Sequence, residues 1–231
     1  LKLESDLKID SVVINDYYFG DISAYGKKSD NDKAYDIRIK LINESLDRLM
    51  IEGQLYTDRK RKEKIKLAVN FSNFDLGFLN SLNIKGISKV AGIADGLVNI
   101  SGDYKNPVIE GKLAIDKGGI TVDMIGSHMT FSNQIDFKKD YIGVDPFYLK
   151  DDEGHKALAY GTILHDHFKD WNFNLDIEID DFKALDLKQN IESLYYGQAY
   201  ATGNFNISGY DDKLFITIDA KTEPNTNVSI P

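Results

Sequence analysis

The sequence predicts an all-β protein built as an elongated stack of antiparallel strands. Three observations predict this fold class. Apolar and polar residues alternate with period two along most of the chain, which is typical of strands with one apolar face. Turn-forming clusters separate these stretches at short intervals. Two short motifs recur farther along the chain, as in stacked, repetitive architectures.

The clearest alternation covers residues 171–179 (WNFNLDIEI), whose five apolar residues share one face of a strand. Similar alternation covers residues 35–41, 65–71 and 214–220, with shorter versions at 120–122 and 135–137. Turn signals occupy residues 27–33, 58–64, 117–119, 138–140, 151–154 and 210–213. Counting the stretches between turns predicts about sixteen to eighteen strands, mostly antiparallel neighbours because the connections are short.

Two internal repeats support one elongated unit over residues 1–231. GLVNISG at residues 96–102 matches GNFNISG at 203–209, a spacing of 203 − 96 = 107 residues. IEGQLYTD at residues 51–58 matches IEGKLAID at 109–116, a spacing of 109 − 51 = 58 residues. These matches predict weak repeats over about residues 1–90, 91–190 and 191–231.

Two segments depart from period two and predict short helices. Residues 74–82 (FDLGFLNSL) place apolar residues at helical spacing, and Asn73 precedes them as a possible cap. Residues 182–194 (FKALDLKQNIESL) stand at the equivalent place in the second repeat, because 182 − 74 = 108. Each segment is expected either to cover part of the apolar face or to end the groove locally.

Composition excludes some function classes. The net charge is −9, so phosphate backbones repel the chain and nucleic acid is not an expected partner. The absence of cysteine fits both an oxidising compartment and the cytosol. The sequence shows no leader and no run near the ~20 apolar residues of a membrane span. Because Leu1 begins within an alternating pattern, we expect a piece of a longer protein, with any export signal or anchor outside it.

Catalytic and metal-binding motifs are not evident. His165 and His167 lie on one side of a strand with Asp170 nearby, which is half of a metal site. A polar hairpin end is the preferred interpretation because no third ligand is evident; His128 and His155 are expected at surface or turn positions. The acidic residues 151–153 lack the glycine-spaced calcium loop, and no carboxylate pair stands out for glycoside hydrolysis. The sequence therefore predicts no enzyme, no metal and no cofactor.

The basic run at residues 59–62 is flanked by Asp58 and Glu63. This pattern favours a solvated hairpin tip over a nucleic-acid or lipid-headgroup site. The apolar face itself leaves two alternatives open. The strands either pack as a filled sandwich, which the large apolar residues favour, or fold over into a trough whose apolar lining stays open to a ligand.

Motifs spread over the second two thirds of the chain carry a family resemblance. They are GLVNISG (96–102) with NPVIEGKL (106–113), GGI (118–120), IDF (135–137) before DEG (152–154), YYGQAYATGNFNISG (195–209), KTE (221–223) and NTNVSIP (225–231). In this order they resemble the C-terminal region of the TamB family, the translocation and assembly module proteins of Gram-negative bacteria, in the form found in Bacteroidetes. The resemblance covers roughly residues 70–231, and the first seventy residues are similar only in their general sequence pattern.

The resemblance implies a trough. Such proteins are anchored in the inner membrane, cross the periplasm and work with a TamA- or BamA-like outer-membrane barrel. They are similar to AsmA-like bridge-type lipid transfer proteins, whose curled antiparallel sheet is called a β-taco. The family is linked to phospholipid movement and to assembly of outer-membrane proteins, and it has no catalytic residues. The implied partners are therefore phospholipid acyl chains, the barrel protein and unfolded outer-membrane proteins.

Alternation and resemblance together predict a lipid-groove lining. It comprises Val98, Ile100, Leu113, Ile115, Ile120, Val122, Ile135, Phe137, Phe173, Leu175, Ile177, Ile179, Phe205, Ile207, Ile216 and Ile218. Five glycines are expected to let the sheet bend sharply: Gly53, Gly96, Gly111, Gly161 and Gly203. Unpaired edges of such a sheet are an alternative site, where strands of a client protein add by β-augmentation.

Overall fold

The computed structural model describes residues 4–30, 33–189, 194–210 and 213–230. They form one antiparallel sheet of fourteen strands and one short 3-10 helix, η1. The elements in chain order are β1 (Glu4–Ile14), β2 (Tyr17–Lys28), β3 (Ala34–Asn43), β4 (Leu46–Tyr56), β5 (Ile65–Asp75), η1 (Leu76–Leu82), β6 (Ile87–Gly102), β7 (Pro107–Val122), β8 (Ser127–Phe137), β9 (Tyr141–Lys150), β10 (Lys156–Asp166), β11 (Lys169–Leu187), β12 (Tyr196–Tyr210), β13 (Lys213–Thr222) and β14 (Asn227–Ser229).

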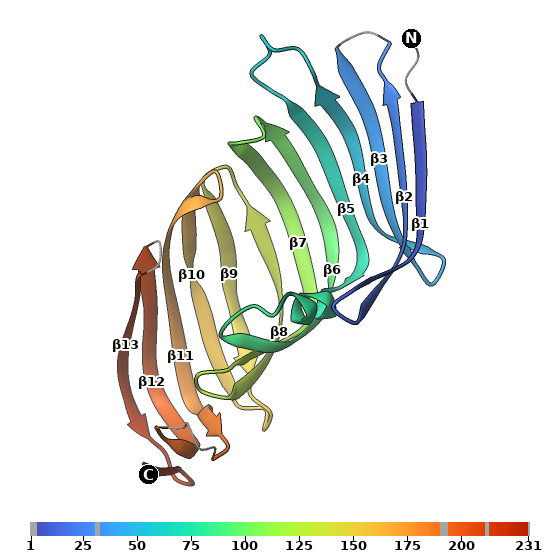
Figure 1. The fold of residues 1–231 in the computed structure, drawn as a ribbon. Coiled ribbons are helices and arrows are strands. Elements are labelled where there is room, and N and C mark those ends of the chain that lie inside the picture. Colours follow the sequence, from blue (N-terminus) through green and yellow to red (C-terminus); the bar gives the residue numbers. More distant parts are fainter. Residues whose placement is uncertain (1–3, 31–32, 190–193, 211–212, 231) are drawn as a thin grey trace.

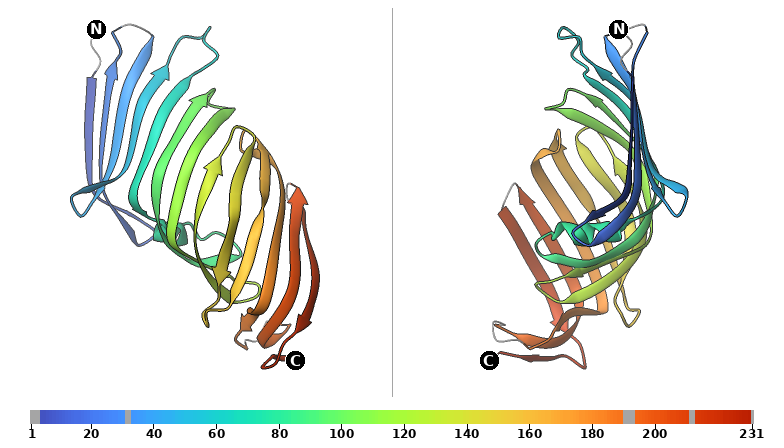
Figure 2. Two further views of the ribbon diagram at one scale, coloured as in Figure 1. Left: turned by 180° about the vertical axis from the view of Figure 1, so that it is seen from behind. Right: turned by 45° about the vertical axis from the view of Figure 1, so that its right-hand side comes forward.

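The strands follow one another in space as they do in sequence. The sheet order runs from β1 to β13 without a crossover, and β14 pairs with the start of β12 (Figure 1). The two termini therefore lie at opposite ends of an elongated sheet. Figure 2 shows that the sheet is curled, with one end of the strands turned over to the side where η1 lies. The predicted all-β, curled antiparallel architecture is confirmed.

The predicted number of strands is wrong, because several strands are longer than the turn signals imply. The described residues contain fourteen strands, and β11 alone has 19 residues. The sequence KGG at residues 117–119 predicts a turn, but it lies inside β7. Lys117 has a φ of 50° there, and the register of β7 against β8 shifts between Ile115 and Gly118. These residues therefore form a β-bulge, which bends a strand without ending it.

One of the two predicted helices is present. Residues 74–82 contain η1, but its N-cap is Asp75, whose carboxylate accepts from the Gly77 N–H, and not Asn73. The second predicted helix is wrong at its start, because residues 182–187 form the last part of β11. Residues 190–193 of that prediction lie outside the described residues.

Two bulges at equivalent places in the repeats let β5 and β11 turn over. Asn73 in β5 and Asp181 in β11 have φ values of 46° and 45°, a conformation that Asn and Asp tolerate better than most residues. The Asn73 N–H donates to Asp95 Oδ1 at 2.8 Å, and the Asp181 N–H donates to Thr202 Oγ1 at 3.0 Å. The spacings are 181 − 73 = 108 and 202 − 95 = 107 residues, so the repeat seen in the sequence recurs as a structural device.

The same device occurs in two further strands. The Ser11 N–H of β1 donates to Asp21 Oδ1 at 2.8 Å, and the Lys117 N–H of β7 donates to Ser132 Oγ at 3.0 Å. In every one of these four bulges, a side chain of the next strand satisfies the backbone N–H that the bulge removes from the ladder. An unsatisfied backbone donor would otherwise oppose the bend.

Glycines next to the bulges bring neighbouring strands close together. Gly96 in β6 and Gly203 in β12 have φ values of 155° and 154°, which favour glycine. A Cβ on Gly96 would lie 2.2 Å from the Lys112 carbonyl oxygen, and one on Gly203 would lie 2.2 Å from that of Asp219. The other three predicted bend glycines, Gly53, Gly111 and Gly161, share this φ range.

Replacing Gly96 by alanine is expected to destabilise the sheet strongly. The new Cβ would collide with backbone and not with a movable side chain, so we expect a loss of about 2–4 kcal/mol in the free energy of unfolding. Urea unfolding followed by far-ultraviolet circular dichroism measures this loss. Gly26→Ala in β2 is the matched control, because no atom lies within 4 Å of its new Cβ; its stability should be unchanged or slightly higher. Equal stability of Gly96→Ala and Gly26→Ala would contradict the role of Gly96.

Candidate functional site: the apolar face of the sheet

The strand register aligns apolar residues into rows that cross the whole sheet. The central row contains thirteen paired positions, all apolar or glycine. In order across the sheet they are Ile9, Ile22, Leu41, Leu49, Phe71, Gly96, Leu113, Ile135, Val144, Gly161, Leu175, Ile207 and Ile216. With neighbouring strands ~4.8 Å apart, twelve steps give a row roughly 58 Å long.

A second row lies two residues away along each strand on the same face. Its thirteen positions are also apolar or glycine. They are Leu7, Ala24, Ile39, Ile51, Val69, Val98, Gly111, Phe137, Ile142, Ile163, Phe173, Gly209 and Leu214. We call the surface formed by these two rows the apolar face. Neither row contains a charged residue.

All sixteen residues of the predicted lining fall on this side of the sheet; thirteen lie in the rows or two residues from them, and Ile120, Val122 and Ile179 lie farther along their strands. Their exposure differs, however. Val98, Ile115 and Ile179 are buried, Ile216 and Ile218 on β13 are exposed, and the other eleven are half-buried. Ile120 and Val122 remain on the face only because the bulge at Lys117 shifts the register of β7.

The apolar face also includes β1 to β5, where the predicted lining has no residue. Leu41, Leu49 and Phe71 continue the central row there. The alternation at residues 35–41 and 65–71 signals Leu41 and Phe71, but the motifs that carry the family resemblance begin at residue 96 and the predicted lining begins at Val98. The apolar face is therefore longer than the predicted lining.

The opposite face of the sheet is largely polar. Ion pairs join neighbouring strands on it, such as Lys40 with Asp47 at 2.6 Å and Lys112 with Asp136 at 3.4 Å. The amide of Asn206 donates to Asp176 Oδ1 at 2.8 Å across β12 and β11. This division of apolar and polar side chains predicts that the polar face contacts water and that the apolar face contacts other apolar groups, from the protein or from a ligand.

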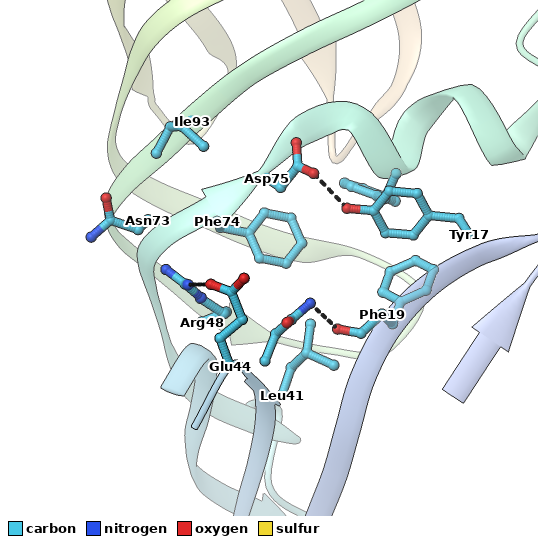
Figure 3. Close-up of a pocket in the computed structure, with 11 residues that line it drawn as sticks. Tyr17, Phe19, Leu41, Glu44, Arg48, Asn73, Phe74, Asp75 and Ile93 are labelled. Carbon is cyan, nitrogen blue, oxygen red and sulfur yellow. Dashed lines mark hydrogen bonds and ion pairs between the residues drawn. The ribbon is translucent and has the colours of Figure 1, made fainter. Parts of the chain in front are cut away.

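The turned-over end of the sheet covers part of the apolar face; we call this end the closed end. In the N-terminal half the cover is η1, whose Phe78 ring packs against Phe74 of β5 at 5.4 Å and Phe19 of β2 at 5.6 Å between centroids. A cavity of about 300 Å³ remains beside this cluster (Figure 3). The prediction that residues near 74–82 cover part of the apolar face therefore matches where η1 lies.

In the C-terminal half, strand ends form the cover. The turn between β7 and β8 reaches the end of β11, although β9 and β10 lie between them in the sheet order. Ser127 Oγ donates to the Lys183 carbonyl oxygen at 2.7 Å, and the Asp186 N–H donates to the Ile125 carbonyl oxygen at 2.9 Å. Beneath this cover lies a buried apolar cluster that includes Leu149, Ala157 and Phe182.

A polar cluster fixes this second cover in place. The Asp151 side chain is 1% exposed, and its carboxylate accepts from the Lys183 N–H and His155 Nδ1, both at 2.9 Å. Burial raises the pKa of Asp151, but hydrogen bonds from Lys183, His155 and Glu153 more than offset burial, so its pKa lies below the usual value. The Lys183 ammonium binds Glu153 at 2.6 Å, and this hydrogen bond raises the pKa of Lys183.

The histidines serve separate structural roles. His165 is buried against Phe168 and Trp171, and burial lowers its pKa. His167 binds Asp166 Oδ1 at 2.6 Å instead of joining His165. The hydrogen bond to Asp151 raises the pKa of His155 in the turn between β9 and β10. Among the described residues, no group of three or more His, Asp or Glu side chains could hold a metal ion.

The basic run lies at a turn between β4 and β5. Arg61 stacks over the Tyr56 ring at 3.4 Å and pairs with Glu63 at 2.8 Å. Arg59, Lys60 and Lys62 are exposed.

Across the described part of the chain, no helix is long and apolar enough to cross a membrane.

Comparisons with known proteins identify no relative. No family model, no curated protein and no solved structure matches the chain.

The Asp151 cluster predicts a loss of stability in acid. Because the pKa of Asp151 is lower in the folded than in the unfolded chain, its stabilisation is present above about pH 4, the unfolded value, and is lost as the pH falls through the folded pKa. Asp151→Asn should lower the free energy of unfolding at pH 7 by about 1.5–3 kcal/mol, since a buried, charge-assisted hydrogen-bond network is weakened. Urea unfolding at pH 7 and pH 3 tests this prediction. The exposed neighbour offers a control, Asp152→Asn, which should behave as wild type; a similar loss in both variants would refute the assignment.

Proposed function

We propose that the chain is a non-catalytic segment of a conduit that carries lipid acyl chains along the apolar face. The observation that carries this proposal is the pair of uncharged rows that crosses thirteen strands without interruption. Rows roughly 58 Å long are about twice the ~30 Å hydrocarbon thickness of a bilayer. A face of this length suits an acyl chain that moves along it better than a ligand held at one point.

The energetics of acyl chains support movement along such a face. Each CH₂ group exposed to water costs about 0.8 kcal/mol, so an acyl chain needs continuous apolar contact to avoid a barrier. Most residues of the two rows are half-buried, which leaves part of each side chain for a ligand. A charged residue in either row would interrupt this path, and neither row has one.

The wider setting of this function is also a proposal. By its resemblance to the TamB family, the segment would lie in the periplasm of a Gram-negative bacterium, anchored in the inner membrane by another part of the protein. It would carry phospholipid toward the outer membrane together with a TamA- or BamA-like barrel protein.

The edges of the sheet favour a second candidate function. β1 and β13 end the sheet order, and both expose apolar side chains, including Ile9 at 45% and Ile218 at 59%. Such edges can accept an extended strand of an unfolded outer-membrane protein by β-augmentation. A photo-crosslinking residue at Thr217 of β13 should then capture client strands, whereas one at Asn174 in the sheet interior should not. Equal capture at both positions would exclude this edge role.

A charge on the apolar face should weaken acyl-chain binding. Leu175→Asp places a carboxylate in the central row, whereas Asn174→Asp places it one residue away on the polar face of the same strand. We expect Leu175→Asp to lower the affinity for an acyl-labelled fluorescent phospholipid at least about tenfold, which corresponds to about 1.4 kcal/mol. Asn174→Asp should bind as wild type does.

Fluorescence titration of the two folded variants measures this difference. Circular dichroism shows whether each variant has kept the sheet. Wild-type affinity in a folded Leu175→Asp variant would contradict the proposed path.

A further inference from the structure

The cavity beside η1 combines an apolar base with charges of both signs. Its base includes Leu41 and Phe74, each 8% exposed, together with Phe19 and Phe78. Figure 3 shows Arg48 and Glu44 on one side of the Phe74 ring and Asp75 with Tyr17 on the other. A volume of about 300 Å³ is enough for a small polar headgroup.

The base of the cavity is continuous with the apolar face. Leu41 lies both in the cavity wall and in the central row, between Ile22 and Leu49. The partly buried residues Leu49 and Phe71 pack against the buried cluster formed by Leu41, Phe74 and Ala94. An amphiphile with its polar end in the cavity could therefore lay its apolar part along the rows.

Arg48 provides the positive end. Its side chain is only 19% exposed, and its Nη2 donates to Glu44 Oε2 at 3.0 Å. Glu44 is 79% exposed, and ion pairs with such exposed partners contribute little to stability. A phosphate diester can replace Glu44, because a guanidinium binds phosphate oxygens through two parallel N–H donors.

Asp75 provides the negative end. Its Oδ2 accepts from the Tyr17 hydroxyl at 2.7 Å, and its Oδ1 accepts from the Gly77 N–H at 2.7 Å. Burial and the hydrogen bond to Asp75 raise the pKa of Tyr17 to about 12, so the hydroxyl remains a donor at neutral pH. Each carboxylate oxygen can accept a further hydrogen bond. The rings of Tyr17 and Phe74 beside it add favourable surroundings for a cation.

From this arrangement, and resting on the proposed function, we infer that the cavity binds the headgroup of a zwitterionic phospholipid that carries a primary ammonium, a phosphoethanolamine. Its phosphate binds Arg48 and its ammonium binds Asp75, while its acyl chains follow the apolar face. The headgroup has about eight non-hydrogen atoms, which the cavity can hold.

Other headgroups fit the charges less well. Glu44 and Asp75 against Arg48 give a formal charge of −2 + 1 = −1. A purely anionic headgroup would leave Asp75 without a cation and facing a second negative charge. A quaternary ammonium has no N–H to donate to Asp75, so it keeps the charge attraction and the ring contacts but loses the hydrogen bond.

Calorimetric titration with short-chain lipids tests the inference on the full 231-residue chain. The probes are dihexanoyl phosphatidylethanolamine, phosphatidylcholine and phosphatidylglycerol, each below its micelle concentration. Because their acyl chains are identical, differences in affinity report the headgroup. We expect phosphatidylethanolamine to bind about tenfold more tightly than the other two lipids.

Variants assign the two ends of the headgroup. Asp75→Asn keeps an oxygen for the Gly77 N–H, and it should lower the affinity for phosphatidylethanolamine to that of phosphatidylcholine while leaving phosphatidylglycerol binding no weaker. Arg48→Gln should weaken all three lipids. The control is Arg38→Gln on the polar face, where Arg38 pairs with Glu52; it should change none of the affinities.

The outcomes separate this inference from the proposed function. Equal binding of the three lipids to the wild-type chain, with loss of all three in Leu175→Asp, would overturn the headgroup site and leave the acyl-chain conduit standing. Failure of every lipid to bind the wild-type chain would overturn both. The comparison among lipids uses the wild-type chain, so it does not depend on the folding of any variant.

Discussion

The structure depends on one backbone constraint: long strands must turn over at one end while they remain paired with their neighbours. Asn73 and Asp181 meet it by adopting a left-handed conformation at a bulge, and side chains of the next strand accept the N–H that each bulge releases. Gly96 and Gly203 then allow close approach of the neighbouring backbone. Without these features the sheet would be flatter, and its apolar face would lack an enclosed side.

The two repeats use the same bend and then cover the apolar face differently. After the bulge at Asn73 the chain leaves the sheet as η1, and its aromatic residues fill the closed end. After the bulge at Asp181 the chain continues as β11 and meets the turn between β7 and β8. Sequence spacing identifies the equivalent places, but the pattern of the second segment predicts a helix. There Lys183 and Asp186 make contacts with residues distant in sequence, and these contacts hold it extended.

Much of the apolar face follows from sequence, because alternation assigns each strand one apolar side. The rows depend in addition on register, and residues such as Ile120 lie in line only because a bulge at Lys117 shifts β7. Alternation alone does not predict such a bulge, and the sequence KGG predicts a turn instead. The cavity beside η1 was not predictable either. It joins Tyr17, Arg48 and Asp75, which no local pattern relates, and only the curl brings them together.

The central claim is that the apolar face accepts lipid. Native mass spectrometry of the purified chain, followed by organic extraction of what co-purifies, tests it most directly. The account predicts folded protein with bound phospholipid at a defined stoichiometry, with lower occupancy in Leu175→Asp than in Asn174→Asp. A lipid-free mass for the wild-type chain, together with failure to take up added phospholipid, would contradict it and would shift the function toward protein–protein interaction at the sheet edges.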